Sequence, residues 1–315
     1  MSRRELAALA AVLVLLALLP AVGNNYVLRV GTTMLMYAVL AMAWNFIGGF
    51  AGYPSFATAA FFGLGAYAGA IVQSKGLPAI SAWIFAAGVS ALVALLLGLA
   101  VLRLRGHAFA IATLVVVELL REIVNGWVSL TGGGMGINLP GAMTPEQGAR
   151  YYFYAMLALA AITYCAMHAV AIRRLGFGLR CIKQNEDAAS MVGVNTTVFK
   201  SLAFMLSAAF TAAAGAVYAS WTAYIEPADV FDIMFSIKAI VMVLLGGAGT
   251  LLGPVLGAVA FLALDELVWR NFLTLHTGIL GLLIILLILF LPMGLTTFSW
   301  RTALGSWRPA PGRRT

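Results

Sequence analysis

The long apolar stretches of this sequence contain very few ionisable side chains, and those few are the first candidates for chemistry. Glu118, Arg121 and Glu122 occupy positions i, i+3 and i+4 of one apolar segment, so they share a face of a helix. Ionisable groups at membrane depth are costly unless they pair or face water. The pattern predicts either that Glu118 and Arg121 line a hydrated solute pathway, or that they form an ion pair that fixes helix packing.

A second candidate group combines polar side chains and glycines around the third apolar segment: Asn45, Ser55, Thr58, Gly63, Gly65 and Tyr67. The start of a helix at membrane depth attracts a carboxylate, because its first amides are free and its dipole is positive there. The group therefore fits a pathway for a zwitterionic amino acid. The alternative is that the hydroxyls bond to backbone carbonyls and that the glycines serve close helix packing.

A third candidate lies in the longest polar run between apolar segments, residues 173–199. Asn185 can cap a helix of about two turns there, and Gly193 can end it. Small and apolar side chains on this helix leave one face free to contact a partner protein. The residues expected to make or shape that contact are Glu186, Asp187, Ala188, Ala189, Met191 and Gly193.

Motifs for catalysis, nucleotides and metals are absent from the sequence. It contains no G-x-x-x-x-G-K-[ST], no H-E-x-x-H and no C-x-x-C, so a nucleotide site, a metal site or a bound cofactor is not expected. The two cysteines, Cys165 and Cys181, are too few for a disulfide framework. We expect a protein that is not an enzyme.

Composition places the chain in a membrane. Its 315 residues are 63% hydrophobic and 10% charged, against about 25% charged in soluble domains. We predict an all-α polytopic membrane protein that forms a single transmembrane domain over residues 1–315, with segments 3 and 8 short or broken by glycine. Its apolar segments are expected at about 6–22, 28–49, 55–73, 79–102, 108–128, 151–171, 199–223, 232–246, 251–269 and 275–292.

Basic residues predict the orientation. With ten spans and both termini in the cytoplasm, thirteen of the 19 Lys and Arg residues lie inside, which matches the positive-inside rule. The 173–199 loop is then cytoplasmic, and the net charge of +8 reflects topology rather than nucleic-acid binding. The inside residues are Arg3, Arg4, Arg103, Arg105, Arg173, Arg174, Arg180, Lys183, Lys200, Arg301, Arg308, Arg313 and Arg314.

Two glycine-rich stretches occupy similar places in the two halves, at 61–70 and 244–258. Together with the even number of spans they favour an inverted five-plus-five repeat, as in many transporters. The outer loop at about 129–150 is rich in Gly and Pro and shows no periodicity, so we expect it to be irregular.

Several motifs, in order, resemble the branched-chain amino acid ABC transporter permeases of the LivM type. They are AFFGLGAYAGA (60–70), LRLRGHAFAIATLVVVELLREIVNGWVSLTGG (102–133), FGLRCIKQNEDAASMVGVN (177–195), LAFMLSAAFTAAAGAVYA (202–219) and LLGGAGTLLGPVLGA (244–258). The resemblance covers about Met34 to Gly294. It departs from the family at 51–58, before the third segment, and at His107, where an acidic residue is common.

The resemblance implies a subunit of a bacterial inner-membrane importer. Its expected partners are a homologous second permease, two ABC ATPase subunits, a periplasmic substrate-binding protein and the lipid bilayer, with no nucleic acid. Glu186, Ala188, Ala189 and Gly193 match the E-x-A-A-x-x-x-G loop through which such permeases engage their ATPases. ATP hydrolysis is then expected on the separate ATPase subunits.

The function expected is transport of branched-chain amino acids or a similar small polar solute. Relatives with this likeness also carry urea, amides and aromatic acids, which are alternatives for the substrate. A different alternative is a secondary transporter or channel that acts alone, for which Glu118 and Glu122 are the nearest ion-coupling carboxylates.

Overall fold

The computed structural model describes residues 16–17, 19–20, 24–139, 144–271, 278, 281 and 294–296. Within these residues the chain is helical apart from short connections and one two-stranded sheet, which confirms the expected all-α class. The expected first and tenth segments, 6–22 and 275–292, fall almost entirely outside the described residues.

The expected segments from the second to the ninth all form helices. The long helices are α2 (Asn25–Trp44) with a π-helical turn η1 (Asn45–Gly49), α3 (Thr58–Ser74), α4 (Ala79–Val101), α5 (His107–Gly126), α7 (Pro145–Ile172), α10 (Thr196–Thr222), α12 (Met234–Gly246) and α13 (Gly253–Asn271). The short ones are α6 (Val128–Thr131), the 3-10 turn η2 (Gly133–Met135), α8 (Arg174–Gln184), α9 (Glu186–Met191) and α11 (Pro227–Val230).

Four of the described helices are long and apolar enough to cross a membrane: Asn25–Gly49, Ala79–Val101, Glu146–Ile172 and Thr196–Thr222. Helices α3 and α12 have 17 and 13 residues, so at 1.5 Å per residue both are shorter than the roughly 30 Å hydrocarbon layer. Their short lengths agree with the prediction for the third and eighth segments.

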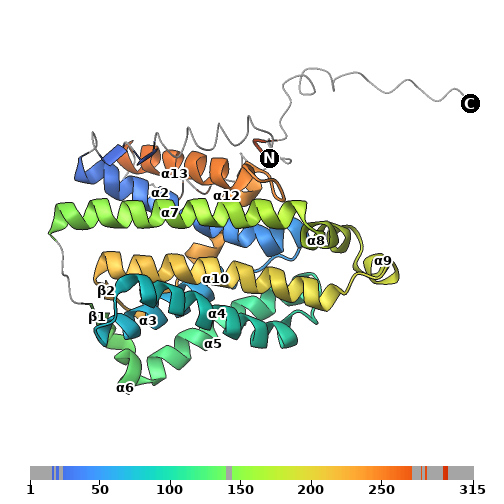
Figure 1. Cartoon of the computed structure of the whole chain (residues 1–315), viewed down its shortest axis with the longest axis horizontal. Coiled ribbons are helices and arrows are strands. Elements are labelled where there is room, and N and C mark those ends of the chain that lie inside the picture. The colour runs from blue at the N-terminus through green and yellow to red at the C-terminus, as the bar shows by residue number, and fades with distance from the viewer. Residues whose placement is uncertain are drawn as a thin grey trace, which may run out of the picture.

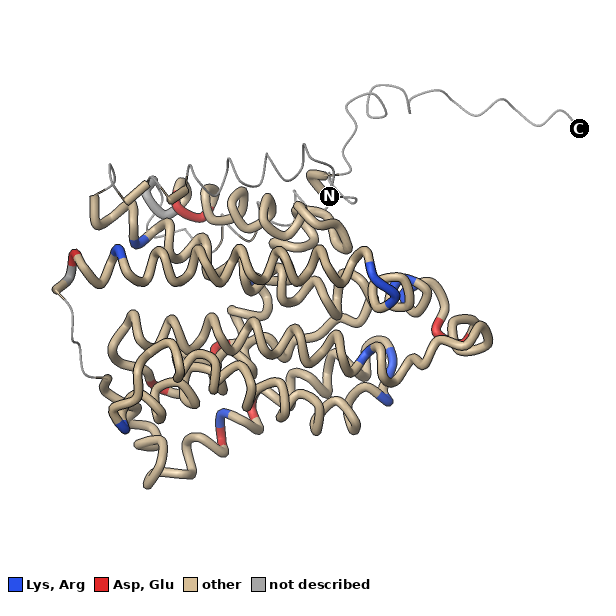
Figure 2. Tube along the Cα trace, viewed as in Figure 1, with Lys and Arg blue, Asp and Glu red and all other residues tan. Residues whose placement is uncertain are grey.

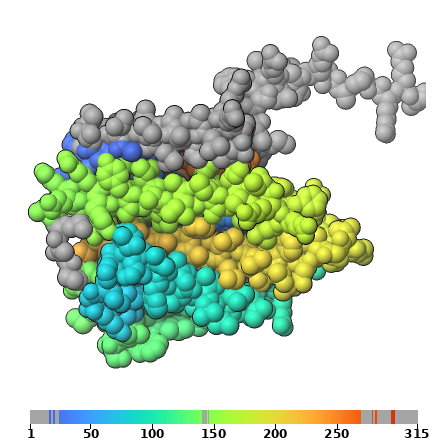
Figure 3. Space-filling model, in the orientation of Figure 1, coloured from blue at the N-terminus to red at the C-terminus, as the bar shows by residue number. Residues whose placement is uncertain are grey.

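Helix α10 is the centre of the bundle. It packs against α3 and α4 on one side and against α2 and α7 on the other. Figure 1 shows α7 and α10 running side by side, with α3, α4 and α5 below them and α2, α12 and α13 above. In Figure 3 the surface of α7 lies between the surfaces of α2 and α10.

Small residues bring the central helices close together. The buried positions of α4 recur every fourth residue and are all small: Ala82, Ala86, Ser90, Ala94 and Gly98. Between α3 and α10 the backbones themselves touch. A Cβ atom at Gly65 would lie less than 3.0 Å from the carbonyl oxygen of Ala212, and one at Gly215 would lie as close to that of Phe62. Only glycine fits at either position.

In its described residues, 129–139 and 144–150, the expected outer loop is more regular than we predicted. It contains α6, η2 and strand β1 (Ile137–Asn138), and α7 begins within it at Pro145, a residue that suits a first helical turn. Strand β1 pairs antiparallel with β2 (Tyr224–Ile225), the strand that follows α10. The prediction failed because the ordering contacts come from a segment far along the chain, and no local periodicity records them.

The contact between α3 and α10 gives a test. We expect Gly65→Ala to lower the free energy of unfolding by about 1–3 kcal/mol or more, because the new methyl group overlaps the α10 backbone. Gly88→Ala on α4 is the matched control, since a Cβ atom there meets nothing within 4 Å. The measurement is the thermal unfolding midpoint of each protein purified in detergent. Equal midpoints for the two variants would contradict the close approach.

Candidate functional site

A short helix with defined ends projects from one end of the bundle. Helix α9 begins after Asn185, whose side-chain oxygen accepts a hydrogen bond from the amide of Ala188 at 3.0 Å. It ends before Gly193, which has a positive φ of 87°. Figure 1 shows α9 lying beyond the ends of α7 and α10. The sequence prediction of a capped helix with a glycine stop is confirmed.

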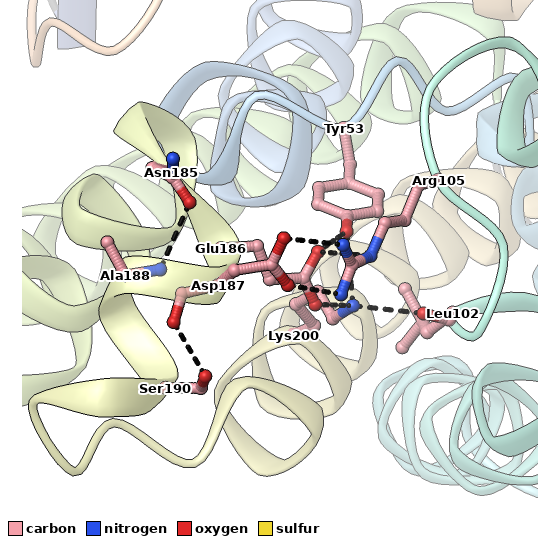
Figure 4. Close-up of polar contacts among 9 residues, drawn as sticks. All are labelled: Tyr53, Leu102, Arg105, Asn185, Glu186, Asp187, Ala188, Ser190 and Lys200. Carbon is pink, nitrogen blue, oxygen red and sulfur yellow. Dashed lines mark hydrogen bonds and ion pairs between the residues drawn. The ribbon is translucent and has the colours of Figure 1, made fainter.

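A largely buried ion pair, called the buried pair below, fastens α9 to α10. Glu186 lies in the first turn of α9, and its Oε1 accepts a hydrogen bond from the Nζ of Lys200 at 2.6 Å. The Lys200 residue is only 4% exposed. Its ammonium group also donates to the hydroxyl of Tyr53 at 3.1 Å and to the carbonyl of Leu102 at 3.0 Å. Lys200 thereby joins four parts of the chain (Figure 4).

Tyr53 and Arg105 also contact the two acidic residues at the start of α9, Glu186 and Asp187. The hydroxyl of Tyr53 donates to Oε2 of Glu186. Arg105, in the turn between α4 and α5, binds both carboxylate oxygens of Asp187 at 3.0 and 3.2 Å, and its Nε lies 3.4 Å from Glu186. The Arg105 and Asp187 side chains are largely exposed, so their pair contributes modestly to stability. The buried pair is the stronger attachment.

These contacts keep the Glu186 carboxyl ionised. Burial alone would raise its pKa, but hydrogen bonds from Lys200 and Tyr53 and the charges of Lys200 and Arg105 outweigh burial and hold the pKa below its ordinary value. The pKa of the Tyr53 hydroxyl is raised, mainly by burial and next by its hydrogen bond to Glu186. The hydroxyl therefore stays protonated and can donate this bond. The stability that Glu186 adds is complete above the ordinary carboxyl pKa and is lost as the pH falls through the lowered one.

The same end of the bundle holds two further polar links. The ammonium of Lys183 on α8 donates to the carbonyl of Gly49 in the π-helical turn at 2.9 Å. The side chain of Asn45, at the start of that turn, accepts from the amide of Gly249 at 2.9 Å and donates to the carbonyl of Thr250 at 3.0 Å. Helices α8 and α9 are thus connected to α2, α10 and the loop between α12 and α13.

The residues expected to contact a partner divide into two groups. Met191 is 86% exposed and the adjoining Val192 is 77% exposed, so both present apolar surface outward. Ala189 is 2% exposed and packs inside this chain, because the first turn of α9 is drawn inward by Glu186. In this conformation the exposed apolar surface of α9 therefore lies at its far end rather than at Ala189, and the contact with a partner stays a prediction.

The start of α3 is closed to a ligand within this chain. Ser236 of α12 accepts the amide hydrogen of Ala59 at 2.8 Å and donates to the carbonyl of Phe56 at 2.5 Å. Ser55 and Thr58 are each 2% exposed. The position that we expected a carboxylate to take is therefore occupied by the serine of a neighbouring helix, and a pathway role for these residues stays a prediction.

Three more predicted pathway residues lie in packed surroundings. A Cβ atom at Gly63 would lie 2.6 Å from the ring of Phe231. Tyr67 is 2% exposed and stacks on the same ring, with the centroids 6.2 Å apart. Gly65 contacts α10, as described above. In this conformation the third segment is filled by its own neighbours, and its glycines serve packing.

Glu118 and Arg121 lie elsewhere, on the outward face of α5. Their side chains are 62% and 38% exposed and approach to 3.4 Å. Ile111, Val115 and Leu119 are exposed on the same helix. The structure therefore does not join this pair to the buried residues of α3, and the two predicted pathway groups are separate.

Sequence reasoning missed the roles of Lys200, Arg105 and Ser236. Lys200 and Arg105 were counted only as basic residues that set topology, although a lysine inside the first turns of an apolar helix is itself a signal of a buried partner. No pattern in the sequence indicates Ser236, because its partners lie 177 and 180 positions away.

Long apolar helices, close small-residue packing and a polar cluster at one end define the class: an α-helical membrane protein with a helix that projects from that end. Residues 26–291 match the model of the family described as the branched-chain amino acid transport system permease component. The chain belongs to this family, which confirms the resemblance seen in its motifs. It is accordingly a permease component and not an enzyme.

Curated proteins of similar sequence are permease proteins too. The chain is 27% identical, over 91% of its own length and 74% of theirs, to the high-affinity branched-chain amino acid transport system permease proteins LivM of Salmonella typhimurium and Escherichia coli. It is also 27% identical, over 55% of its length and 59% of theirs, to the corresponding LivH proteins of both organisms. No solved structure in the comparison matches the chain significantly.

The buried pair can be tested by a double-mutant cycle. Glu186→Leu leaves the buried ammonium of Lys200 without a carboxylate, and we expect it to destabilise the fold by about 3–5 kcal/mol. Lys200→Met should cost less, because Arg105 and Tyr53 still contact Glu186. The double variant should lose much less than the sum of the two. Glu118→Gln, in the exposed pair, is the control and should change stability by about 1 kcal/mol or less. Additive losses in the thermal unfolding of the four proteins would show that the residues do not interact.

Proposed function

We propose that this chain is a permease subunit of an ATP-driven importer for branched-chain amino acids or a similar small polar solute. The observation that carries the proposal is the arrangement of α9. Its outer end presents Met191 and Val192 to a partner, while Glu186 at its inner end is fixed to the membrane helices. A helix exposed at one end and anchored at the other suits the transmission of force between subunits.

The partners in the proposal are two ABC ATPase subunits that contact α9, a periplasmic substrate-binding protein and a second, homologous permease. The matches to both LivM and LivH proteins support a pair of related permeases. We place the assembly in the bacterial inner membrane with both termini in the cytoplasm. The contact of Arg105 with α9 supports this orientation, because it brings two loops predicted to be cytoplasmic to the same end.

We extend the proposal to the architecture of the whole chain. Residues 1–315 form one permease domain of ten spans, with an inverted five-plus-five relation between its halves. Support comes from the described helices, which coincide with the expected second to ninth segments, and from the two glycine-rich elements at α3 and at the turn between α12 and α13. The 173–199 loop, with α8 and α9, is the coupling element of this domain.

The geometry suggests how α9 would act on the spans. If ATPase closure moves α9, the movement reaches α10 through Lys200, the segment before α3 through Tyr53, and the turn before α5 through Arg105. Helix α10 is in backbone contact with α3, so the two should move together. A rigid displacement of packed helices is a common way to change access to a central site.

We propose that the solute pathway runs along the outward face of α5, between this permease and its homologous partner. Glu118 and Arg121 place opposite charges on that face among exposed apolar residues, an arrangement that is costly against lipid and favourable beside a hydrated, zwitterionic solute. The buried group on α3 then supports the pathway from behind rather than touching the solute.

Contact with the ATPase gives the central test. We expect Met191→Asp to leave the permease folded but to reduce co-purified ATPase and ATP-driven leucine uptake into proteoliposomes by at least about tenfold, since it places a charge in an apolar contact. Met135→Asp is the control, because Met135 is also 86% exposed but lies in η2, after the end of α5. The α9 helix contacts the turn before the start of α5, at the other end of that helix. Normal ATPase recovery with Met191→Asp, or uptake that continues without ATP, would reject the proposal.

The pathway has its own test. Glu118→Gln should reduce uptake while the amount of assembled complex stays normal, because an exposed ion pair adds little to folding. Uptake by this variant is compared with that of Glu146→Gln, which removes a carboxylate from the start of α7 instead. Full transport by purified Glu118→Gln complex would show that α5 does not line the route.

A further inference from the structure

Helix α8 packs one face firmly against α7 and α10 and crosses the end of the bundle, a geometry that the coupling role of α9 does not require. Its buried residues include Gly176, Leu179 and Ile182, which lie on one face. The helix is held tightly, since a Cβ atom at Gly176 would lie less than 3.0 Å from the carbonyl oxygen of Val170 on α7, and one at Gly178 would lie as close to the ring of Phe199 on α10. In Figure 1, α8 is seen end-on where α7 and α10 run lengthwise, so it crosses the end of the bundle.

The opposite face of α8 and the adjoining end of α7 together present bulky apolar side chains and arginines. Phe177 is 66% exposed, and Ile172 at the end of α7 is 68% exposed. Arg173, Arg174 and Arg180 surround them, and Figure 2 shows this group of basic residues where α7 meets α8. An exposed helix face with bulky apolar residues and arginines is typical of helices that lie in a membrane interface.

Two grooves meet at the arginines. One, of about 490 Å³, is lined by all three arginines together with Phe177, Val192 and Phe199, among others. The other, of about 610 Å³, lies along the last turn of α7 and is lined by Ala169, Val170, Ile172 and Leu175, with Arg173 and Arg174 at its rim. The second groove is apolar apart from these two arginines.

The charge of the grooves is of one sign. Every charged residue that lines either groove is an arginine. Arg180 donates to the carbonyl of Ala171 at 3.1 Å and so is held in place. Among the residues that the structure describes, Arg173 and Arg174 form no ion pair, and both are exposed.

We propose that this face of α8 binds an anionic phospholipid of the cytoplasmic leaflet, such as phosphatidylglycerol; the choice of leaflet follows from the orientation proposed above. The guanidinium groups of Arg173 and Arg174 bind the phosphate, for which a planar fork of donors is well suited. The apolar groove along α7 receives an acyl chain. A soluble anion would need only the arginines, whereas this groove continues along the apolar surface of a helix long enough to span the membrane.

The proposal does not rest on transport, since lipid binding can be measured whether or not the complex moves a solute. It uses exposed arginines that take no part in the ion pairs holding α9 to the bundle. A contact between this face and an acidic surface of an ATPase subunit is the competing explanation, and the experiment separates the two.

The test measures lipids retained by the purified full-length permease, by native mass spectrometry, after titration with phosphatidylglycerol or phosphatidylcholine. We expect phosphatidylglycerol to bind more tightly. The double variant Arg173→Gln/Arg174→Gln should lose about 25-fold in affinity, or about fivefold for each arginine. Arg103→Gln is the matched control, because Arg103 is an exposed basic residue at the same end but outside both grooves, and it should bind as the native protein does.

The proposal that the groove along α7 receives an acyl chain is tested with short-chain phosphatidylglycerol, which should bind more weakly than the long-chain lipid. Equal binding of the two headgroups, or native affinity in the double variant, would overturn the proposal. Equal binding of short and long chains would overturn the role of the groove along α7. A double variant that keeps its lipid preference but loses co-purified ATPase would assign this face to the protein partner instead.

Discussion

The structure depends on the backbone contact between α3 and α10. Helices in a membrane gain little from burying apolar side chains against one another, because lipid is equally apolar, so close packing must provide the attraction. Gly65 and Gly215 allow the two backbones to touch, and the small residues of α4 continue the contact on the next side of α10. This packing fixes where the first turns of α10, and therefore Lys200, lie at the end of the bundle.

The position of Lys200 in turn determines the order of α9. A helix of six residues is marginal by itself in water, so its stability must come from contacts outside it. Glu186 supplies the main contact, and Tyr53 and Arg105 complete it. Because all of these partners belong to the membrane helices or their connections, α9 is part of the bundle mechanically while its far end remains exposed.

Hydropathy and capping rules predicted the parts of this structure that are local. The apolar segments became helices, and Asn185 and Gly193 bound a short helix as expected. The rules gave no guidance where a residue depends on a distant partner. Glu186 was expected at the contact with another protein and is bonded to Lys200. For the start of α3 the sequence left two readings open, a carboxylate site or packing, and did not indicate that Ser236 bonds there. Periodicity reports which face is apolar and not which residue lies opposite.

The π-helical turn at Asn45–Gly49 contains one extra residue, and this residue sets the orientation of the segment that follows. The amide of Phe50 bonds back to the carbonyl of Asn45, five residues earlier, so the turn holds one residue more than an α-helical turn would. If these residues wound as a regular α-helix, everything after them would be rotated by about 100°, and Tyr53 would point away from Glu186. A relative that lacks one residue at this turn can therefore form a plain α-helix and still keep the bond between Tyr53 and Glu186.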